Sequence, residues 1–383
     1  MFTIELAVID HIHAVCFTAG ATKPKSKAEL MSAVTLCLSK SPVGESCDID
    51  KWDVSGVNDF SGVFRDAKSF NSDISKWDVS SATNMREMFR GAKAFNKDIT
   101  NWSVSKVTDM TEMFRDAASF NGDISSWQVG RVTTMYRMFE NTKVFNGDIS
   151  KWDVSRVTNT NLMFNQASSF NNDISNWNMA SVTDMQGMFV FASSFNSDIS
   201  RWDVSRVKIM AHMFHGAVVF KGDISKWDVS SATTMKHMFE GAKAFNSDLS
   251  TWSVSLVTSM NRMFYQAESF NSNIANWNVS SVTSMVDMFS GATSFNQDIS
   301  KWSPLSATNM MRMFYNAKAF AQTLCGASWL NSKAKMDDIF TGSSGKFCAD
   351  KVTAPASSSI TTAGSLHLWH INHHSDYPGQ TAQ

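Results

Sequence analysis

A column of carboxylates is the feature of this 383-residue chain that most directly suggests chemistry. Carboxylates stacked about 5 Å apart repel one another, so such a column needs compensating groups. Ca²⁺ is one candidate, because it binds about six to eight oxygen ligands, and backbone N–H donors at a turn are the other. The aspartates recur every 25 residues, with Asn273 as the one substitution, at Asp48, Asp73, Asp98, Asp123, Asp148, Asp173, Asp198, Asp223, Asp248 and Asp298.

The backbone-donor interpretation of this aspartate column is the one we favour. Asn273 interrupts the column without changing the 25-residue period, and no glycine-rich calcium-loop pattern accompanies it. An asparagine column that begins at Asn71, Asn96 and Asn121 can supply further hydrogen bonds at the same turn. The sequence therefore predicts a structural aspartate column, and it predicts no metal and no other cofactor.

Histidines form two clusters that could bind zinc or titrate near pH 6. His212 and His237 are one period apart and should stack in neighbouring repeats, and His215 follows His212 at helical spacing. Neither cluster has cysteine or carboxylate partners at ligand spacing, so the sequence does not favour a zinc site. The second cluster comprises His367, His370, His373 and His374.

Catalytic motifs are missing from the sequence. No nucleophile–base constellation, phosphate loop or H-E-x-x-H motif is found, and Thr341–Lys346 resembles a phosphate loop without its spacing. The chain is therefore predicted not to be an enzyme. Its net charge is −1 and only 18% of its residues are charged, which argues against nucleic acid as a partner. No apolar run approaches the roughly 18 residues needed to span a bilayer, and Met1–Ala21 is a poor secretory signal.

A strict repeat must position these residues. Tryptophan recurs every 25 residues at 52, 77, 102, 127, 152, 177, 202, 227, 252, 277 and 302. A period of this length indicates a solenoid, in which each unit packs its apolar side against its neighbours. Ile74-x-x-Trp77-x-Val79 has the spacing of a leucine-rich-repeat strand, whereas apolar steps of three and four over 82–92 predict a short helical segment.

These patterns define the expected fold class. We predict an α/β repeat with about eleven coils, one short parallel strand and one short helical segment per coil, and a right-handed crossover. Because Trp77 and Val79 share one face of the strand, the tryptophans should point into the core. A ladder of exposed tryptophans that stack on sugars is the alternative.

The segments on either side of the array are predicted to cap it. We expect an N-terminal segment with a helical cap at 1–47, the solenoid at 48–322, a C-terminal cap at 323–349 and a disordered tail at 350–383. All five cysteines lie in these flanks. Their spacing fits disulfides that join Cys37 to Cys47 and Cys325 to Cys348, with Cys16 unpaired, and buried free thiols are the alternative.

The repeat unit F-N-x-D-I-S-x-W-D-V-S-x-V-T-x-M-x-x-M-F-x-x-A resembles that of the BspA-like leucine-rich-repeat surface proteins of bacteria, microalgae and other protists. The resemblance covers residues 48–322, and the capping segments at 25–47 and 322–348 look like those of algal members. It implies a non-enzymatic interaction or adhesion scaffold, extracellular or at the cell surface. It does not imply a particular ligand.

The outward strand positions are the predicted recognition face. Where the residue after tryptophan is Asp, the residue before it is Lys or Arg, and two residues apart on a strand share a face. We expect matched charges and a near-neutral polar surface that binds a protein or glycan, on a monomeric chain with no membrane span. The candidate residues are Ser75, Asp78, Ser80, Lys151, Asp153, Arg201, Asp203, Lys226 and Asp228.

The alternative function is a structural rod or a rod that binds ordered water, as ice-binding proteins do. A regular threonine array would favour it. The exposed columns instead mix Lys, Asp, Ser, Asn and Arg, which counts against it.

Overall fold

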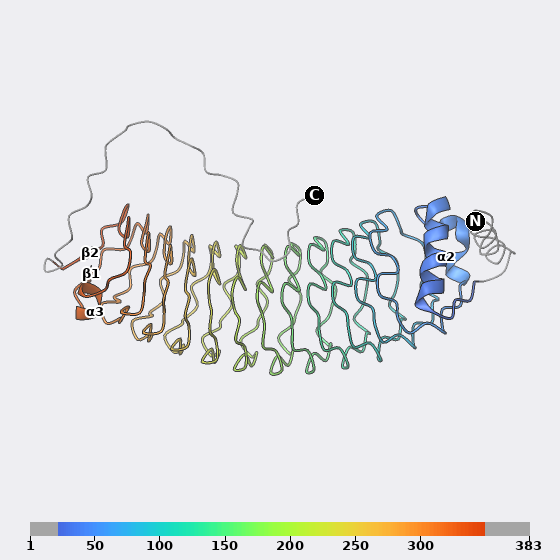
Figure 1. The fold of residues 1–383 in the computed structure, drawn as a ribbon, viewed down its shortest axis with the longest axis horizontal. Coiled ribbons are helices and arrows are strands. Elements are labelled where there is room, and N and C mark those ends of the chain that lie inside the picture. Colours follow the sequence, from blue (N-terminus) through green and yellow to red (C-terminus); the bar gives the residue numbers. More distant parts are fainter. Residues whose placement is uncertain (1–21, 349–383) are drawn as a thin grey trace, which may run out of the picture. The chain divides into compact units, whose positions relative to one another are not determined.

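The computed structural model describes residues 22–348, and its regular elements lie at the two ends of this range. Cys16, the tail 350–383 and its histidines lie outside the described residues. Between the ends the chain runs as loops that lie side by side (Figure 1). The elements are α2 (Lys27–Lys40), the 3₁₀ turns η1 (Glu45–Cys47) and η2 (Ile49–Lys51), β1 (Thr323–Leu324), α3 (Ala327–Leu330) and β2 (Lys346–Phe347).

Backbone hydrogen bonds join each coil to the next along one side of the array, which we call the ladder side. Parallel single-residue bridges link positions 25 residues apart, from Asp59 with Asn84 onward. In the second coil, N–H groups two residues apart donate to the coil that follows. The N–H of Met85 donates to Asp109 O at 3.0 Å, and that of Phe89 donates to Met113 O at 2.9 Å. The array is therefore a stack of coils held by backbone bonds on this side.

The predicted strand and helix of each coil are wrong. The segment 82–92 is not helical, because Glu87 (φ 56°) and Gly91 (φ 69°) adopt left-handed conformations that end any helical run. Successive tight turns produce the apolar steps of three and four: Met88 N–H donates to Met85 O at 3.2 Å. The ladder runs through this segment and not through Trp77 and Val79. The right-handed sense of the coil stays a prediction.

Tryptophan side chains join the coils on the opposite side, which we call the Trp side. The Trp77 indole N–H donates to the carbonyl of Ile49, 28 residues earlier, at 2.8 Å. Every later tryptophan of the array repeats this bond at distances of up to 3.2 Å. Trp77 is 3% exposed, and its equivalents are similarly buried. The tryptophans therefore point into the core as predicted, and a ladder of sugar-stacking tryptophans is excluded.

The coils lie further apart on the Trp side than on the ladder side. Backbone bonding holds neighbouring chains about 4.8 Å apart. Phe89 and Phe114, next to the ladder, have ring centroids 5.6 Å apart, whereas those of Trp202 and Trp227 are 6.3 Å apart. Because both pairs are equivalent residues of adjacent coils with nearly parallel rings, the difference measures divergence of the coils. The Trp side is thus the more open side.

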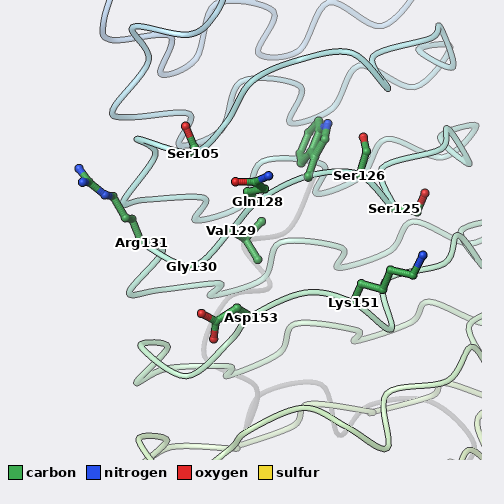
Figure 2. Close-up of a pocket in the computed structure, with 10 residues that line it drawn as sticks. Ser105, Ser125, Ser126, Gln128, Val129, Gly130, Arg131, Lys151 and Asp153 are labelled. Atoms are coloured by element: carbon green, nitrogen blue, oxygen red, sulfur yellow. The ribbon is translucent and has the colours of Figure 1, made fainter.

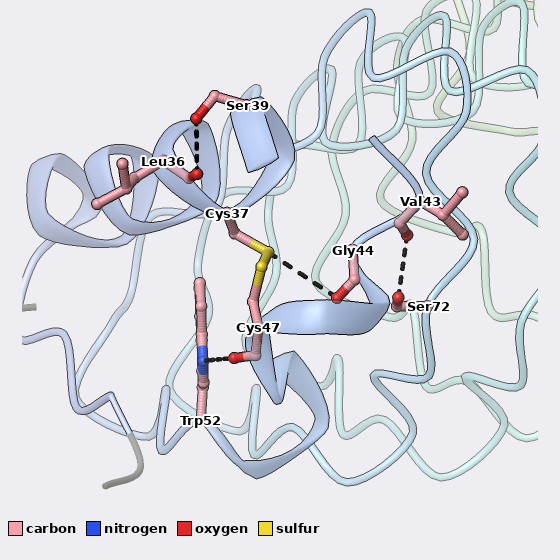
Figure 3. Close-up of a disulfide and its surroundings, with 8 residues drawn as sticks. All are labelled: Leu36, Cys37, Ser39, Val43, Gly44, Cys47, Trp52 and Ser72. Carbon is pink, nitrogen blue, oxygen red and sulfur yellow. Dashed lines mark hydrogen bonds between the residues drawn. A yellow bond between two sulfur atoms is a disulfide. The ribbon is translucent and has the colours of Figure 1, made fainter. Parts of the chain in front are cut away.

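The N-terminal cap provides the apolar contacts and the carbonyl acceptor that a preceding coil would provide. Ser26 caps α2 by accepting the N–H of Glu29, and the buried face of the helix carries Leu30, Val34 and Cys37. Cys37 is bonded to Cys47, one of the two predicted pairs (Figure 3). Since no coil precedes the first one, Trp52 donates its indole N–H to Cys47 O at 3.2 Å.

The C-terminal cap closes the last coil in a similar way. β1 and β2 pair in parallel, and Cys325 is bonded to Cys348, the second predicted pair. Trp329, in α3, donates to Ile299 O at 3.1 Å. The tryptophan bond of the array therefore continues into the cap, although the spacing here is 30 residues.

Removing one tryptophan side chain from the middle of the array should destabilise it strongly. Trp152→Ala leaves a cavity and an unpaired carbonyl at Ile124, so we expect the free energy of unfolding to fall by about 3–5 kcal/mol. Urea denaturation followed by circular dichroism measures this loss. Lys151→Ala, at the exposed position just before, should change it by less than about 0.5 kcal/mol, and equal losses in the two variants would contradict the assigned role.

Candidate recognition surface

The predicted recognition residues lie on the Trp side, within three residues of the tryptophan of their coil. Those with charged side chains are exposed, whereas Ser75 and Ser80 are half-buried. The structure brings Lys151 and Asp153 together at one hollow and distributes the others over separate coils. The exposed charged members are Asp78, Lys151, Asp153, Arg201, Asp203, Lys226 and Asp228.

The expected charge matching on this face does not take the form of ion pairs. Within residues 22–348, no ion pair joins a lysine or arginine of this face to the aspartate two residues later. Asp53 pairs instead with Lys23 at 2.6 Å, and Lys51 pairs with Asp48 at 2.8 Å. Exposed pairs contribute little, so the long cationic side chains remain available to a partner.

The aspartates that follow tryptophan are held by the backbone two residues later. Asp78 Oδ1 accepts the N–H of Ser80 at 3.0 Å, and Asp153 Oδ1 accepts that of Ser155 at 3.0 Å. The serine hydroxyl, then the backbone N–H, lowers the pKa of each of these two carboxyl groups. Ser80 therefore orients Asp78, which is a positioning task rather than direct recognition.

The 25-residue aspartate column is built in the same way. Asp73 Oδ1 accepts the N–H of Ser75 at 2.8 Å, and the bond recurs along the column. Asn273, the one substitution, makes the same bond to the N–H of Ala275 at 3.0 Å. A neutral amide can thus replace the carboxylate, which supports the backbone-donor interpretation.

Asparagine side chains form a second ladder beside the aspartates. Asn71 Oδ1 accepts the backbone N–H of Asn96 at 3.0 Å, Asn96 does the same for Asn121, and the pattern recurs. Lys221 interrupts it, because its side chain offers no acceptor to Asn246. A shallow hollow of about 380 Å³ lies here and includes both residues. A departure from the repeat therefore opens the surface.

A larger hollow of about 570 Å³ lies four coils into the array. Figure 2 shows Arg131 and Lys151 extending toward opposite sides, with Gln128 between them. Three serine hydroxyls and one carboxylate complete the polar lining, whereas Trp127 and Val129 are core residues that contribute only their edges. The remaining lining residues are Ser105, Ser125, Ser126, Gly130 and Asp153.

Three departures from the repeat create this hollow. Gly130 stands in a column otherwise occupied by Ser, Ala or Leu, and Ser126 stands where coils with Asp after tryptophan have Lys or Arg. Gln128 replaces the aspartate that would accept the N–H of residue 130. A Cβ atom at Gly130 would lie 3.0 Å from Asp153 Oδ2, so even a small side chain would crowd this space.

The histidines stack in adjacent coils, as predicted, but on the ladder side. The rings of His212 and His237 lie 4.4 Å apart at an angle of 8°, and His215 Nδ1 lies 3.5 Å from His212 Nδ1. Burial lowers the pKa of His212 to about 2 and that of His215 to about 4. His237 bonds to Glu240. Burial acts to raise the pKa of Glu240, but the bond from His237 together with the charges of the neighbouring histidines and Arg262 holds it below its ordinary value.

No group of three or more His, Cys, Asp or Glu residues within 22–348 has an arrangement that could hold a metal ion. The backbone of both His212 and His237 is left-handed (φ 60° and 59°), as the turn at this place in the coil requires. The cluster is therefore part of the packed edge of the ladder, and its polar groups face one another.

Sequence reasoning missed the ion-pair network on the same edge. Arg90 contacts Glu87 at 3.0 Å and Glu112 at 3.3 Å, and Arg115 contacts Glu112 and Glu140 at 3.1 Å each. The signal was present in the sequence, as opposite charges three residues apart within a coil and again 22 or 25 residues apart between coils. This network joins neighbouring coils on the ladder side.

Fold and surface together define a repeat protein of the solenoid class, with stacked coils and a variable outward face. In comparisons with known proteins, the family model described as "Mycoplasma protein of unknown function, DUF285" matches residues 38–152, 133–252 and 243–352. These matches cover most of the chain, and the chain belongs to this family.

No curated protein matches the chain. Among solved structures, the chain is similar to a leucine-rich repeat protein from Eubacterium ventriosum, with 11% sequence identity and a TM-score of 0.37, over 83% of this chain and 88% of that one. In the described part of the chain, none of the helices is long and apolar enough to cross a membrane.

The aspartate column should resist chelation and respond to acid. Its hydrogen-bonded carboxylates, such as Asp173, have lowered pKa values, because Ser175 bonds to the ionised form. Their stabilisation is therefore present above the unfolded pKa near 3.8 and is lost as the pH falls through the lower folded value. We expect the melting temperature to drop below about pH 4 and to be unchanged by EDTA at neutral pH.

A pair of variants isolates the bond at Asp173. Asp173→Asn keeps it, as Asn273 does, and should unfold like the wild type at pH 7, whereas Asp173→Ala should cost about 0.5–1.5 kcal/mol. A melting temperature that falls on chelation would instead establish a calcium column.

The buried histidines should weaken the fold in mild acid. Their pKa values are lowered on folding from about 6.5, so the unfolded chain binds protons first and stability is lost as the pH falls from about 6.5 toward 4. His212→Asn, whose side chain tolerates the left-handed backbone, should flatten this part of the pH–stability profile measured by urea denaturation. Asp173→Asn is the control that should leave it unchanged, and an unaltered slope in His212→Asn would contradict the assignment.

Proposed function

We propose that this protein is a non-enzymatic recognition scaffold that binds a glycan or protein through its Trp side, outside the cell or at the cell surface. One observation carries the proposal: an almost invariant framework presents outward side chains that differ from coil to coil. Tryptophan, phenylalanine and aspartate recur because the stack requires them, whereas the positions on either side of tryptophan vary. Repeat proteins place their binding surfaces at such variable positions.

Three features support this proposal. Both hollows lie on the Trp side, where the coils diverge and where the repeat is interrupted. The lysine and arginine side chains of the face make no ion pairs within residues 22–348 with the aspartates beside them, so a partner meets unengaged charges. The two cap disulfides suit an oxidising compartment, which supports an extracellular location.

A rod that binds ordered water is the second candidate, and one feature favours it more than the sequence led us to expect. Threonines recur at one exposed position of most coils, where the mixed composition of the surface had argued against a regular array. Thr108 Oγ1 donates to Thr83 O at 3.2 Å, so these hydroxyl protons are used inside the protein. Lys208 interrupts the column, which comprises Thr83, Thr108, Thr133, Thr158, Thr183, Thr233, Thr258, Thr283 and Thr308. Recognition therefore remains the favoured function.

The two functions predict different binding behaviour. Full-length protein screened on a glycan array and against secreted proteins should retain a defined partner. A variant that carries Lys151→Ser, Asp153→Asn, Lys226→Ser and Asp228→Asn should lose most of this binding. It should keep its melting temperature, because the lysines are exposed and asparagine keeps the bond to the backbone N–H, as Asn178 and Asn278 do.

The control carries Lys93→Ser and Lys318→Ser, exposed lysines that directly follow the ladder segment of their coils, and should bind like the wild type. Retention of no glycan and no protein, together with thermal hysteresis that Thr158→Ala reduces, would replace recognition by the ordered-water function.

A further inference from the structure

From the hollow of about 570 Å³ on the Trp side, we infer a subsite for a carboxylated sugar, a uronic-acid-type unit of an acidic glycan. This inference rests on the proposed recognition function and names its ligand class. The volume is within the range of small-ligand pockets, about 300–1,000 Å³. The charges and hydrogen-bonding groups at its two ends decide which class of ligand it fits.

One end of the hollow presents a cation among hydroxyl groups. Lys151 is exposed and makes no ion pair in the described part of the chain. Asp148, the carboxylate of the same coil, has its Oδ1 engaged by the N–H of Ser150 at 2.9 Å. Ser125 and Ser126 line the hollow on the same side as Lys151 (Figure 2). The Ser126 hydroxyl donates to Thr100 O at 2.7 Å, so its oxygen is left to accept from a sugar hydroxyl. The ammonium group of Lys151 matches a carboxylate, because hydrogen bonds to an ionised acceptor are the strong ones.

The other end presents one fixed acceptor and several donors. Asp153 keeps Oδ1 on the N–H of Ser155 at 3.0 Å, and its Oδ2 lies toward Gly130. Because residue 128 is Gln, the N–H of Gly130 lacks the acceptor that aspartate provides to its equivalents, such as Ser80. Arg131 lies at this same end (Figure 2), where its charge is balanced by Asp153. A sugar hydroxyl, which can donate to Oδ2 and accept from a nearby N–H, therefore suits this end better than a carboxylate does.

The whole lining favours a sugar over a peptide. Arg131 and Lys151 against Asp153 give a net charge of +1, which suits one carboxylate and not a polyanion. Serine hydroxyls and the Gln128 carboxamide match the hydroxyl groups of a pyranose. Peptides bind to free strand edges, apolar grooves or cation clusters. The hollow offers none of these, since neither β1 nor β2 lines it, its two cations lie on opposite sides and its apolar residues are core residues.

Direct binding tests this subsite with full-length protein. The probes are an immobilised tetrasaccharide of glucuronic acid, the glucose tetrasaccharide of the same linkage, and a tetrapeptide of glutamate. We expect the protein to retain the glucuronic-acid tetrasaccharide, and to retain the other two at least about tenfold more weakly, because each lacks either the carboxylate or the hydroxyl groups.

Variants and matched controls come from the repeat itself. Lys151→Ala should reduce binding about tenfold or more, and Gly130→Ser should reduce it similarly by filling the hollow. Lys301→Ala and Ala180→Ser, the same columns in other coils, should leave it unchanged. If Gly130→Ser does not fold, Gln128→Asp is the second test, since it adds a carboxylate and restores an acceptor for residue 130.

The outcomes separate this inference from the function on which it rests. Equal retention of the glucose and glucuronic-acid tetrasaccharides, preferential binding of the glutamate peptide, or undiminished binding by Lys151→Ala would overturn the subsite. If another glycan or a protein is retained through the Trp side, the recognition function stands while the subsite fails. If the screen retains nothing, both fail.

Discussion

The bond from each tryptophan indole to a carbonyl of the preceding coil is the interaction on which the rest of the structure depends. On the ladder side, backbone groups of adjacent coils satisfy one another. On the Trp side they do not, and the indole N–H of Trp77, bonded to Ile49 O at 2.8 Å, makes the polar connection within the core. Tryptophan has both the largest apolar side chain and a hydrogen-bond donor, so it can fill the core and bond the carbonyl of the preceding coil. This requirement explains why this position of every coil holds tryptophan and not phenylalanine, which also recurs with the period but has no donor.

The coils are spaced unequally on the two sides, and this spacing in the core affects the shape of the surface. Ring centroids 5.6 Å apart beside the ladder and 6.3 Å apart at the tryptophans mean that the outer side chains of the Trp side are separated enough for small substitutions to matter. Gly130 and Lys221 each change one column, and a hollow lies at each. On the ladder side, by contrast, ion pairs such as Arg115 with Glu140 fill the equivalent space. The hollows of the proposed recognition surface thus lie where the coils are not joined by backbone hydrogen bonds.

The sequence predicted what is repeated and missed what depends on backbone conformation. The period, the inward tryptophans, the helical cap and both cysteine pairs follow from residue type and spacing, and the structure has each of them. The strand and helix were wrong because the turns need left-handed residues, and Leu162 (φ 56°) and Phe191 (φ 51°) give no sign of that conformation in the sequence. The hollow could not be predicted, since it arises from the separation of the coils as much as from Gly130.

The 28-residue reach of the tryptophan bond gives the stack a direction. The donor always belongs to the later coil and the acceptor to the earlier one, so a coil's interior is finished only by the sequence that comes after it. During synthesis, the growing chain therefore always carries one incomplete end, and the array cannot stop at an arbitrary repeat. Trp329 resolves this by extending the same bond from a segment that is no longer a repeat. Evolution can change the number of coils by duplicating whole units internally, while the terminating segment has to be kept.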